Sequence, residues 1–350
     1  IINPYELGKV YETSEMLPDA WLRTHESGSG PFYLSDFKPN EKVILEKNEK
    51  YWSSITNIDT ISWIYTADNQ RQKSLAVNSE VDYLFNPDPQ TFLDLMEKPL
   101  FLRSTRTLIV IYLLINKKNS ILKDERIRHA VAYAISYDKM IWKIRYGFGW
   151  RSSGFMKPTL TGYNPNSGIP FYHNPKKAKK LIEETGLKNG FDAELIIDDK
   201  TTDLARVAEI IKLNLEKIGI TLKIDKIPKN KLDEFISKGD FMMTLKKWPM
   251  EIVETAVHLN AIYNSNSAKN LTNYRNEEVE ELFLKLFKED DPSFRDSILK
   301  EIQKTCLEDA SLVPIFNLDM PVITSERIKL SENPTWIESW CLNLNKWSIK

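Results

Sequence analysis

The segment between residues 194 and 224 constrains the fold more than any other part of the chain. Residues 194–197 and 221–224 are short apolar runs that are typical of strands. Between them, apolar residues recur at helical spacing: Leu204, Val207, Ala208, Ile211, Leu215 and Ile218. We expect Thr202 or Asp203 to cap the start of this helix and Gly219 to end it in a left-handed conformation. The pattern predicts a βαβ unit, and therefore an open α/β sheet with a right-handed crossover.

Further helices and strands are predicted on both sides of this unit. Asn174 and Pro175 are typical of a helix start, and Gly186 is typical of the end of the same helix. Other helices are expected at residues 68–77, 124–146, 277–288 and 292–307, and strands at residues 31–34, 42–45, 61–65 and 108–115. The first third is thus rich in strands and the rest is α/β, with no flexible linker between them. At 350 residues, the pattern favours two lobes joined by crossing strands.

Charge and hydropathy exclude several classes of protein. Lys and Arg number 48 and Asp and Glu 49, so the net charge of −1 predicts no attraction to nucleic acid or to an anionic membrane. The longest apolar run, residues 108–115, is far shorter than the roughly 20 residues that a membrane-spanning helix needs. The first residues do not resemble a signal peptide, so the protein is either cytoplasmic or begins, in this chain, after its natural start.

No arrangement of residues predicts catalysis, a metal or a cofactor. The four histidines are far apart in the sequence, and His129 is expected to be structural or solvated. Gly28-Ser29-Gly30 is followed at once by Pro31, where a phosphate-binding loop would need the start of a helix. Cys306 and Cys341 match no metal spacing, and we expect two buried, unpaired thiols. We therefore expect no enzyme.

Tryptophan is the more informative residue type. The chain has nine, and seven fall outside the periodic helices: Trp21, Trp52, Trp150, Trp248, Trp336, Trp340 and Trp347. Tryptophan at loops and strand ends either fills a core or lines a ligand cleft. For any single tryptophan, core filling is the favoured interpretation.

A series of short motifs resembles the family 5 extracellular solute-binding proteins, the dipeptide- and oligopeptide-binding receptors of ABC importers. The first group is Gly28-Ser29-Gly30-Pro31-Phe32, Phe37-Lys38-Pro39, Leu45-Glu46-Lys47-Asn48 and Tyr51-Trp52. The second is Glu80-Val81-Asp82, Ile115-Asn116, Arg126-Ile127-Arg128, Ala132-Tyr133-Ala134-Ile135, Ile218-Gly219-Ile220, Glu308-Asp309-Ala310 and Pro314-Ile315. Each piece is weak alone, but their order across nearly the whole chain is specific.

The resemblance implies an α/β, two-lobe periplasmic-binding-protein fold of the class II, cluster C type. It implies a partial lobe I at residues 1–115, a complete lobe II at 116–321, and a return to lobe I at 322–350. Family members are longer, so we expect this chain to be a C-terminal portion that lacks the leading part of lobe I. The implied place of action is the periplasm, or the outer face of the cell membrane through a lipid anchor.

The resemblance also implies a mechanism and its residues. The hinged lobes close over a peptide and deliver it to an ABC permease in the inner membrane; no nucleic acid takes part, and a monomer is expected. The family holds the α-ammonium of the ligand with an aspartate three residues after a tryptophan, which here places Glu251 after Trp248, with Glu254 as a second acidic position. Glutamate for aspartate, and Thr255 where proline is usual, change the shape of this pocket. Further ligand contacts are expected from Gly30, Phe32 and the 154–156 loop with Phe155.

Two alternatives stay open at this point. Relatives on the same scaffold bind nickel chelates, haem, glutathione, opines or sugars, so the ligand does not follow from the fold. From another class of function, the chain could serve as the solute-binding sensor of a regulator or as a holdase for unfolded chains.

Overall fold

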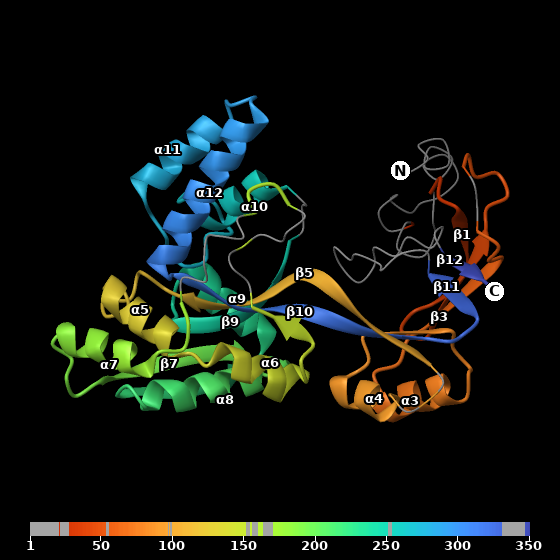
Figure 1. The fold of residues 1–350 in the computed structure, drawn as a ribbon, viewed down its shortest axis with the longest axis horizontal. Coiled ribbons are helices and arrows are strands. Elements are labelled where there is room, and N and C mark those ends of the chain that lie inside the picture. Colours follow the sequence, from red (N-terminus) through yellow and green to blue (C-terminus); the bar gives the residue numbers. More distant parts are fainter. Residues whose placement is uncertain are drawn as a thin grey trace. The chain divides into compact units, whose positions relative to one another are not determined.

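The computed structural model describes residue 21 and residues 28–53, 56–96, 98, 100–151, 155, 160–163, 171–250, 254–330 and 347–350. The chain divides into two compact units (Figure 1). Unit 1 comprises Ile1–Thr105, Met320–Thr335 and Trp340–Lys350, and unit 2 comprises Arg106–Asp319 and Trp336–Ser339. Two of the boundaries between these segments fall inside long strands, β5 (Phe101–Ile115) and β10 (Leu312–Thr324). The assignment of residues to two lobes remains a prediction.

The described part of unit 1 contains short antiparallel sheets and short helices. One sheet has the order β1-β2-β3, formed by β1 (Phe32–Lys38), β2 (Lys42–Lys47) and β3 (Thr60–Ile64). Asn40, with a φ of 60°, makes the turn between the first two strands. The remaining elements are α3 (Asn69–Val77), β4 (Tyr83–Phe85), α4 (Pro89–Asp94), β11 (Ile328–Leu330) and β12 (Trp347–Ile349). β4 pairs with the end of β10, and β11 pairs with β12.

Unit 2 contains the predicted βαβ unit. β7 (Phe191–Asp198) and β8 (Ile220–Ile227) are parallel neighbours, and α8 (Thr202–Glu216) connects them. Gly219 has a φ of +89°, and a Cβ on Gly190 would lie 1.7 Å from the Gly219 carbonyl oxygen, so this corner requires glycine at position 190. The expected cap of α8 was wrong. The helix begins at Thr202, so Thr202 and Asp203 both lie in its first turn, and Thr201 before it makes no capping hydrogen bond.

The sheet of unit 2 is covered by helices on both faces. Its strands follow the order β10-β5-β9-β7-β8, where β9 is Met243–Pro249; the two-residue β6 (Gly149–Trp150) pairs with β10. One face packs on α5 (Glu125–Ala134), α6 (Tyr137–Arg145), α7 (Pro175–Glu184) and α8. The other face packs on α9 (Lys229–Lys238), α10 (Thr255–Tyr263), α11 (Glu277–Leu286) and α12 (Pro292–Asp309). Side chains of β5 alternate between the two cores, with Ile111 in the first and Tyr112 in the second.

The predicted single helix over residues 124–146 is two helices, α5 and α6. The break lies at Ile135, which has an extended conformation with ψ of 128°. The backbone N–H and the hydroxyl of Ser136 both donate to Oδ1 of the buried Asn214, each at 2.8 Å. This bond to α8 satisfies backbone that a continuous helix would have paired internally, and therefore stabilises the break.

A buried ion cluster ties three segments of unit 2 together. Asp309, at the end of α12, accepts from Nη2 of the buried Arg128 at 2.7 Å and from Nζ of Lys117 at 2.6 Å. The other guanidinium nitrogens of Arg128 donate to three carbonyl oxygens, those of Leu122, Lys123 and Asp309. Because the buried charges are both paired and hydrogen-bonded, the cluster avoids the cost of an unpaired buried ion.

Cys306, on the buried face of α12, is an unpaired thiol, as expected. Burial raises the pKa of this thiol well above its ordinary value, so the group stays protonated and unreactive. Cys341 lies outside the described residues. No helix in the described part of the chain is long and apolar enough to cross a membrane.

We predict that Arg128→Met lowers the free energy of unfolding by about 2–3 kcal/mol, because the part-buried Asp309 loses one of its two partners and three carbonyl oxygens lose their donor. Arg126→Met, on the same helix, is the matched control: Arg126 pairs with Asp124 at the surface, where an ion pair contributes at most about 1 kcal/mol. Urea unfolding of the complete protein measures the change in the free energy of unfolding for both variants. Equal effects of the two substitutions would contradict the role of the buried cluster.

Candidate functional site

The antiparallel pairing of β5 with β9 positions the candidate site. The register places Val110 opposite Trp248, and the backbone N–H of Met250 donates to the Leu108 carbonyl at 3.2 Å. Alternate residues of β5 share a face, so Leu108, Val110 and Tyr112 lie in a row beside the end of β9. The chain then leaves the sheet toward α10.

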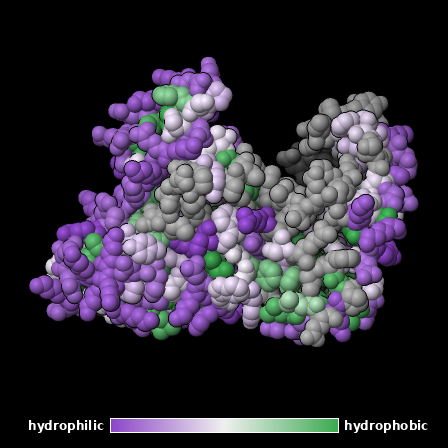
Figure 2. All heavy atoms as spheres, in the orientation of Figure 1, coloured by the Kyte–Doolittle hydropathy of each residue, from purple (hydrophilic) through white to green (hydrophobic). Residues whose placement is uncertain are grey.

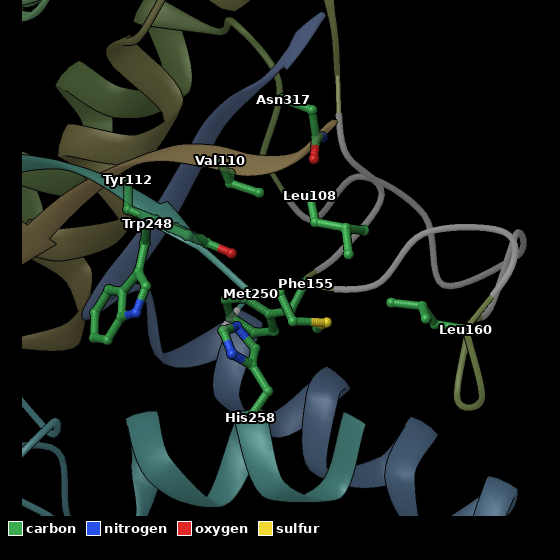
Figure 3. Close-up of a pocket in the computed structure, with 9 residues that line it drawn as sticks. All are labelled: Leu108, Val110, Tyr112, Phe155, Leu160, Trp248, Met250, His258 and Asn317. Atoms are coloured by element: carbon green, nitrogen blue, oxygen red, sulfur yellow. The ribbon is translucent and has the colours of Figure 1, made fainter. Parts of the chain in front are cut away.

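This row forms the wall of a hollow within unit 2 (Figure 3). The full lining comes from three strands (β5, β9 with the residue after it, and β10), a connecting segment and α10: Leu108, Val110, Tyr112, Phe155, Leu160, Trp248, Met250, His258 and Asn317. His258 points from α10 toward Met250 and Phe155 (Figure 3). The enclosed volume is about 10 Å³, enough for about one water molecule.

Three of the lining residues, Tyr112, Phe155 and Trp248, form an aromatic cluster. The Tyr112 ring stands edge-on to Trp248, with 6.4 Å between centroids, and lies 6.0 Å from the Phe155 ring. Phe155 in turn contacts the buried Tyr263 at 5.3 Å. Burial raises the pKa of the Tyr112 phenol, and raises that of Tyr263 well above its ordinary value, so both stay neutral. Rings of this kind bind apolar side chains and aliphatic ligand groups.

One polar group of the lining lacks a partner within the part of the chain that the structure describes. Asn317 is 2% exposed, and its Nδ2 donates no hydrogen bond to any described residue. Because buried amide groups are nearly always hydrogen-bonded, this N–H group needs an acceptor. A water molecule in the hollow, or a carbonyl or carboxylate oxygen of a bound molecule, would supply one.

The mouth of the hollow is held by hydrogen bonds from two helices. Asp296 of α12 accepts from the Gly162 backbone N–H at 2.8 Å, and Nε2 of Gln303 donates to the Gly162 carbonyl at 2.7 Å. The hydroxyl of Thr255, on α10, donates to the Thr161 carbonyl at 2.6 Å. The segment that contributes Leu160 is therefore fixed to the helices beneath it.

The residues predicted as ligand contacts fall in different places. Trp248 and Phe155 line the hollow. Glu254 precedes α10, and its Oε2 accepts from the Val257 backbone N–H at 2.6 Å, so this carboxylate caps the helix. Glu251, and the neighbours of Phe155 at positions 154 and 156, lie outside the described residues. The ligand roles of all these residues stay predictions.

Gly30 and Phe32, the other two predicted contacts, belong to unit 1. The side-chain amide of Asn48 donates to the Gly30 carbonyl at 2.9 Å, which fixes the entry to β1. Phe32 is half-buried and packs beside Ile58 and Trp347.

Sequence reasoning missed most of the lining. The alternation of residues 108, 110 and 112 identifies one face of β5 and could have revealed three of the missed residues. His258 and Asn317 carry no local signal, because tertiary packing brings them to the hollow. Among the described residues no group of three or more His, Cys, Asp or Glu side chains could hold a metal ion.

The sequence is similar to those of bacterial solute-binding proteins. Residues 2–270 match the family model described as "Bacterial extracellular solute-binding proteins, family 5 Middle". The dipeptide-binding protein of Escherichia coli K12 is 28% identical over 202 residues, which is 56% of this chain and 38% of that protein. The glutathione-binding protein GsiB of Shigella flexneri serotype 5b is 22% identical over 303 residues, or 83% of this chain and 59% of that protein. The chain thus spans less than two thirds of the length of either relative.

The crystal structure of the ABC transporter substrate-binding protein CtaP from Listeria monocytogenes has a similar fold. The TM-score is 0.87 at 20% identity, over 97% of this chain and 70% of that one. This likeness confirms the expected α/β periplasmic-binding-protein fold.

We predict that the stability of the complete protein falls as the pH rises above about 10, the ordinary pKa of tyrosine. Burial raises the pKa of Tyr112 and Tyr263 in the folded state, so only unfolding allows their phenols to ionise, and the stabilisation present below pH 10 is lost above it. Urea midpoints at pH 8 and pH 10.5 measure the loss. Between these two pH values the Tyr112→Phe, Tyr263→Phe double variant should lose less stability than the wild type.

Tyr172→Phe is the control for this experiment, because the Tyr172 side chain is 58% exposed and takes no part in the buried aromatic contacts of Tyr112 and Tyr263. A double variant that loses as much stability as the wild type would show that the wall of the hollow is not buried as described.

Proposed function

Because the chain belongs to the family 5 bacterial extracellular solute-binding proteins, we propose that it is part of the receptor of an ABC importer that captures short peptides. Capture is non-covalent, so the proposed role needs no catalytic residue and no cofactor. The observation that carries the proposal is the aromatic hollow of unit 2, whose lining residues Trp248 and Met250 lead directly into the acidic positions Glu251 and Glu254.

The chemistry of the hollow suits a peptide. The enclosed space holds only about one water molecule, so a side chain would contact Tyr112, Phe155 and Trp248 from the open mouth. Such apolar contact adds affinity without selecting one residue type. The unpaired Nδ2 of Asn317 offers a hydrogen bond to a peptide carbonyl or carboxylate oxygen. A small number of polar groups in an otherwise apolar concavity is the usual composition of a ligand site.

Glu251 is the proposed partner of the ligand's α-ammonium. It stands three residues after Trp248, and it follows Met250, which is buried against the hollow. A carboxylate there would form a charge-assisted hydrogen bond with the ammonium, which is about twice as strong as a bond between neutral groups. Dipeptides and glutathione, the ligands in the names of the two relatives, both contain a free α-ammonium.

The partner and the place of action follow from the same proposal. The receptor works outside the cytoplasm, in the periplasm or attached to the outer face of the membrane, and delivers the solute to the importer's permease. The similar Listeria protein is described as an ABC transporter substrate-binding protein, which supports this role. Because the chain spans only part of its relatives, binding experiments require the complete protein.

We predict that Glu251→Gln in the complete protein weakens the binding of tri-alanine by about tenfold or more. Loss of one charge-assisted hydrogen bond costs about 1.5–3 kcal/mol, and 1.4 kcal/mol corresponds to a factor of ten in the dissociation constant. Isothermal titration calorimetry measures the change.

N-acetyl-tri-alanine, which has no ammonium, is the matched ligand control, and its weaker binding should not change with the substitution. Glu254→Gln is the matched protein control, because Glu254 already caps α10 and should affect tri-alanine less than Glu251. If Glu251→Gln leaves the dissociation constant for tri-alanine unchanged, Glu251 is not the ammonium partner.

A further inference from the structure

The helical hairpin formed by α11, α12 and the turn between them exposes large apolar side chains. The two helices lie side by side, with α10 next to them (Figure 1). Nη1 of Arg295 donates to the Leu286 and Glu289 carbonyl oxygens at 2.7 and 3.0 Å, which fixes the turn to the start of α12. The hairpin is therefore a defined structure rather than a frayed end.

Three apolar side chains near this turn point to solvent. Leu284 is 63% exposed, Phe287 51% and Phe294 53%, although α11 buries four other apolar residues against the core. Figure 2 shows hydrophobic residues at the surface of this hairpin, bordered by hydrophilic ones. Single exposed apolar residues are common, but several large ones on one projecting element, rimmed by charges, are typical of an interaction surface.

The hairpin is also strongly acidic. Residues 277–296 contain eight acidic and three basic side chains, a net charge of −5, whereas the whole chain has a net charge of −1. Of these eight acidic groups, Asp296 forms the one ion pair found in the described part of the chain, with Lys300. The surface therefore suits a basic partner with apolar side chains at its centre, and it disfavours an anionic lipid headgroup.

The same hairpin connects to the hollow. Asp296 and Gln303 of α12 hold both backbone groups of Gly162, two residues from Leu160 in the lining. α11 and α12 also pack on α10, which contributes His258 to the hollow. A protein that docks on the hairpin would contact the element that fixes the mouth of the solute site. Among the partners of a solute receptor, the permease is the one that must take over the bound solute.

We infer that the tip of the α11–α12 hairpin, with Leu284, Phe287 and Phe294 at its centre, docks on a basic surface of the importer's permease that faces away from the cytoplasm. This inference rests on the proposed function and adds the location and chemistry of the contact. The apolar side chains supply the affinity, and the acidic rim supplies orientation and a fast association rate.

The test uses the complete protein and the permease complex of the importer in lipid nanodiscs, with docking measured by biolayer interferometry. The double variant Phe287→Ser, Phe294→Ser should dock about tenfold more weakly or worse. Docking of the wild type should also weaken as sodium chloride rises from about 50 to 500 mM, because salt screens exposed charges.

Leu213→Ser is the matched control, since Leu213 is 58% exposed on α8 of the same unit and should change docking less than twofold. Unchanged tri-alanine binding by the double variant establishes that its solute site is intact. A double variant that docks like the wild type overturns the inference and leaves the receptor function in place. A wild-type protein that neither docks nor binds a peptide overturns the proposed function, and self-association through the hairpin would assign the surface to a second copy instead.

Discussion

The unbroken register between β5 and β9 is the constraint on which the candidate site depends. It places Trp248 on the same face as Val110 and Tyr112, and it brings Met250 to the Leu108 carbonyl. A shift of β9 by one residue would turn Trp248 to the opposite core, away from Val110 and Tyr112. The register is stable because β5 lies inside the sheet with apolar cores on both faces, and each core accepts only one set of alternate residues.

Polar groups at the ends of the strands hold this layered structure in one arrangement. Arg128 and Lys117 meet on Asp309, where α12 leads into β10. The side-chain amide of Asn116, just after β5, donates to the Gly239 and Phe241 carbonyls and so ties β5 to the segment that precedes β9. Both sets of contacts hold the joined segments in one position, whereas apolar packing alone would allow these segments to shift. Asn317 differs from them, since the Nδ2 of its buried amide has no acceptor among the described residues.

Local patterns in the sequence predicted the elements that local chemistry determines. The βαβ unit, the buried strand at residues 108–115 and the buried face of α12 follow from periodicity, and the family follows from short motifs in a fixed order. The break between α5 and α6 was missed because it depends on Asn214, 78 residues away from Ser136. Most of the hollow was missed for the same reason, since Asn317 and His258 meet Tyr112 only after the sheet and α10 have packed. The exposure of Phe287 and Phe294 was likewise not predictable, because an amphipathic pattern does not show which apolar residues extend beyond the core.

We propose that the hollow of unit 2 belongs to a receptor for short peptides. Native mass spectrometry of the complete protein, purified from its host without denaturation, tests this claim most directly. The account predicts additional masses that match short peptides with free amino termini. A retained sugar or metal chelate, or protein that stays free of peptide even when peptides are supplied, would contradict it.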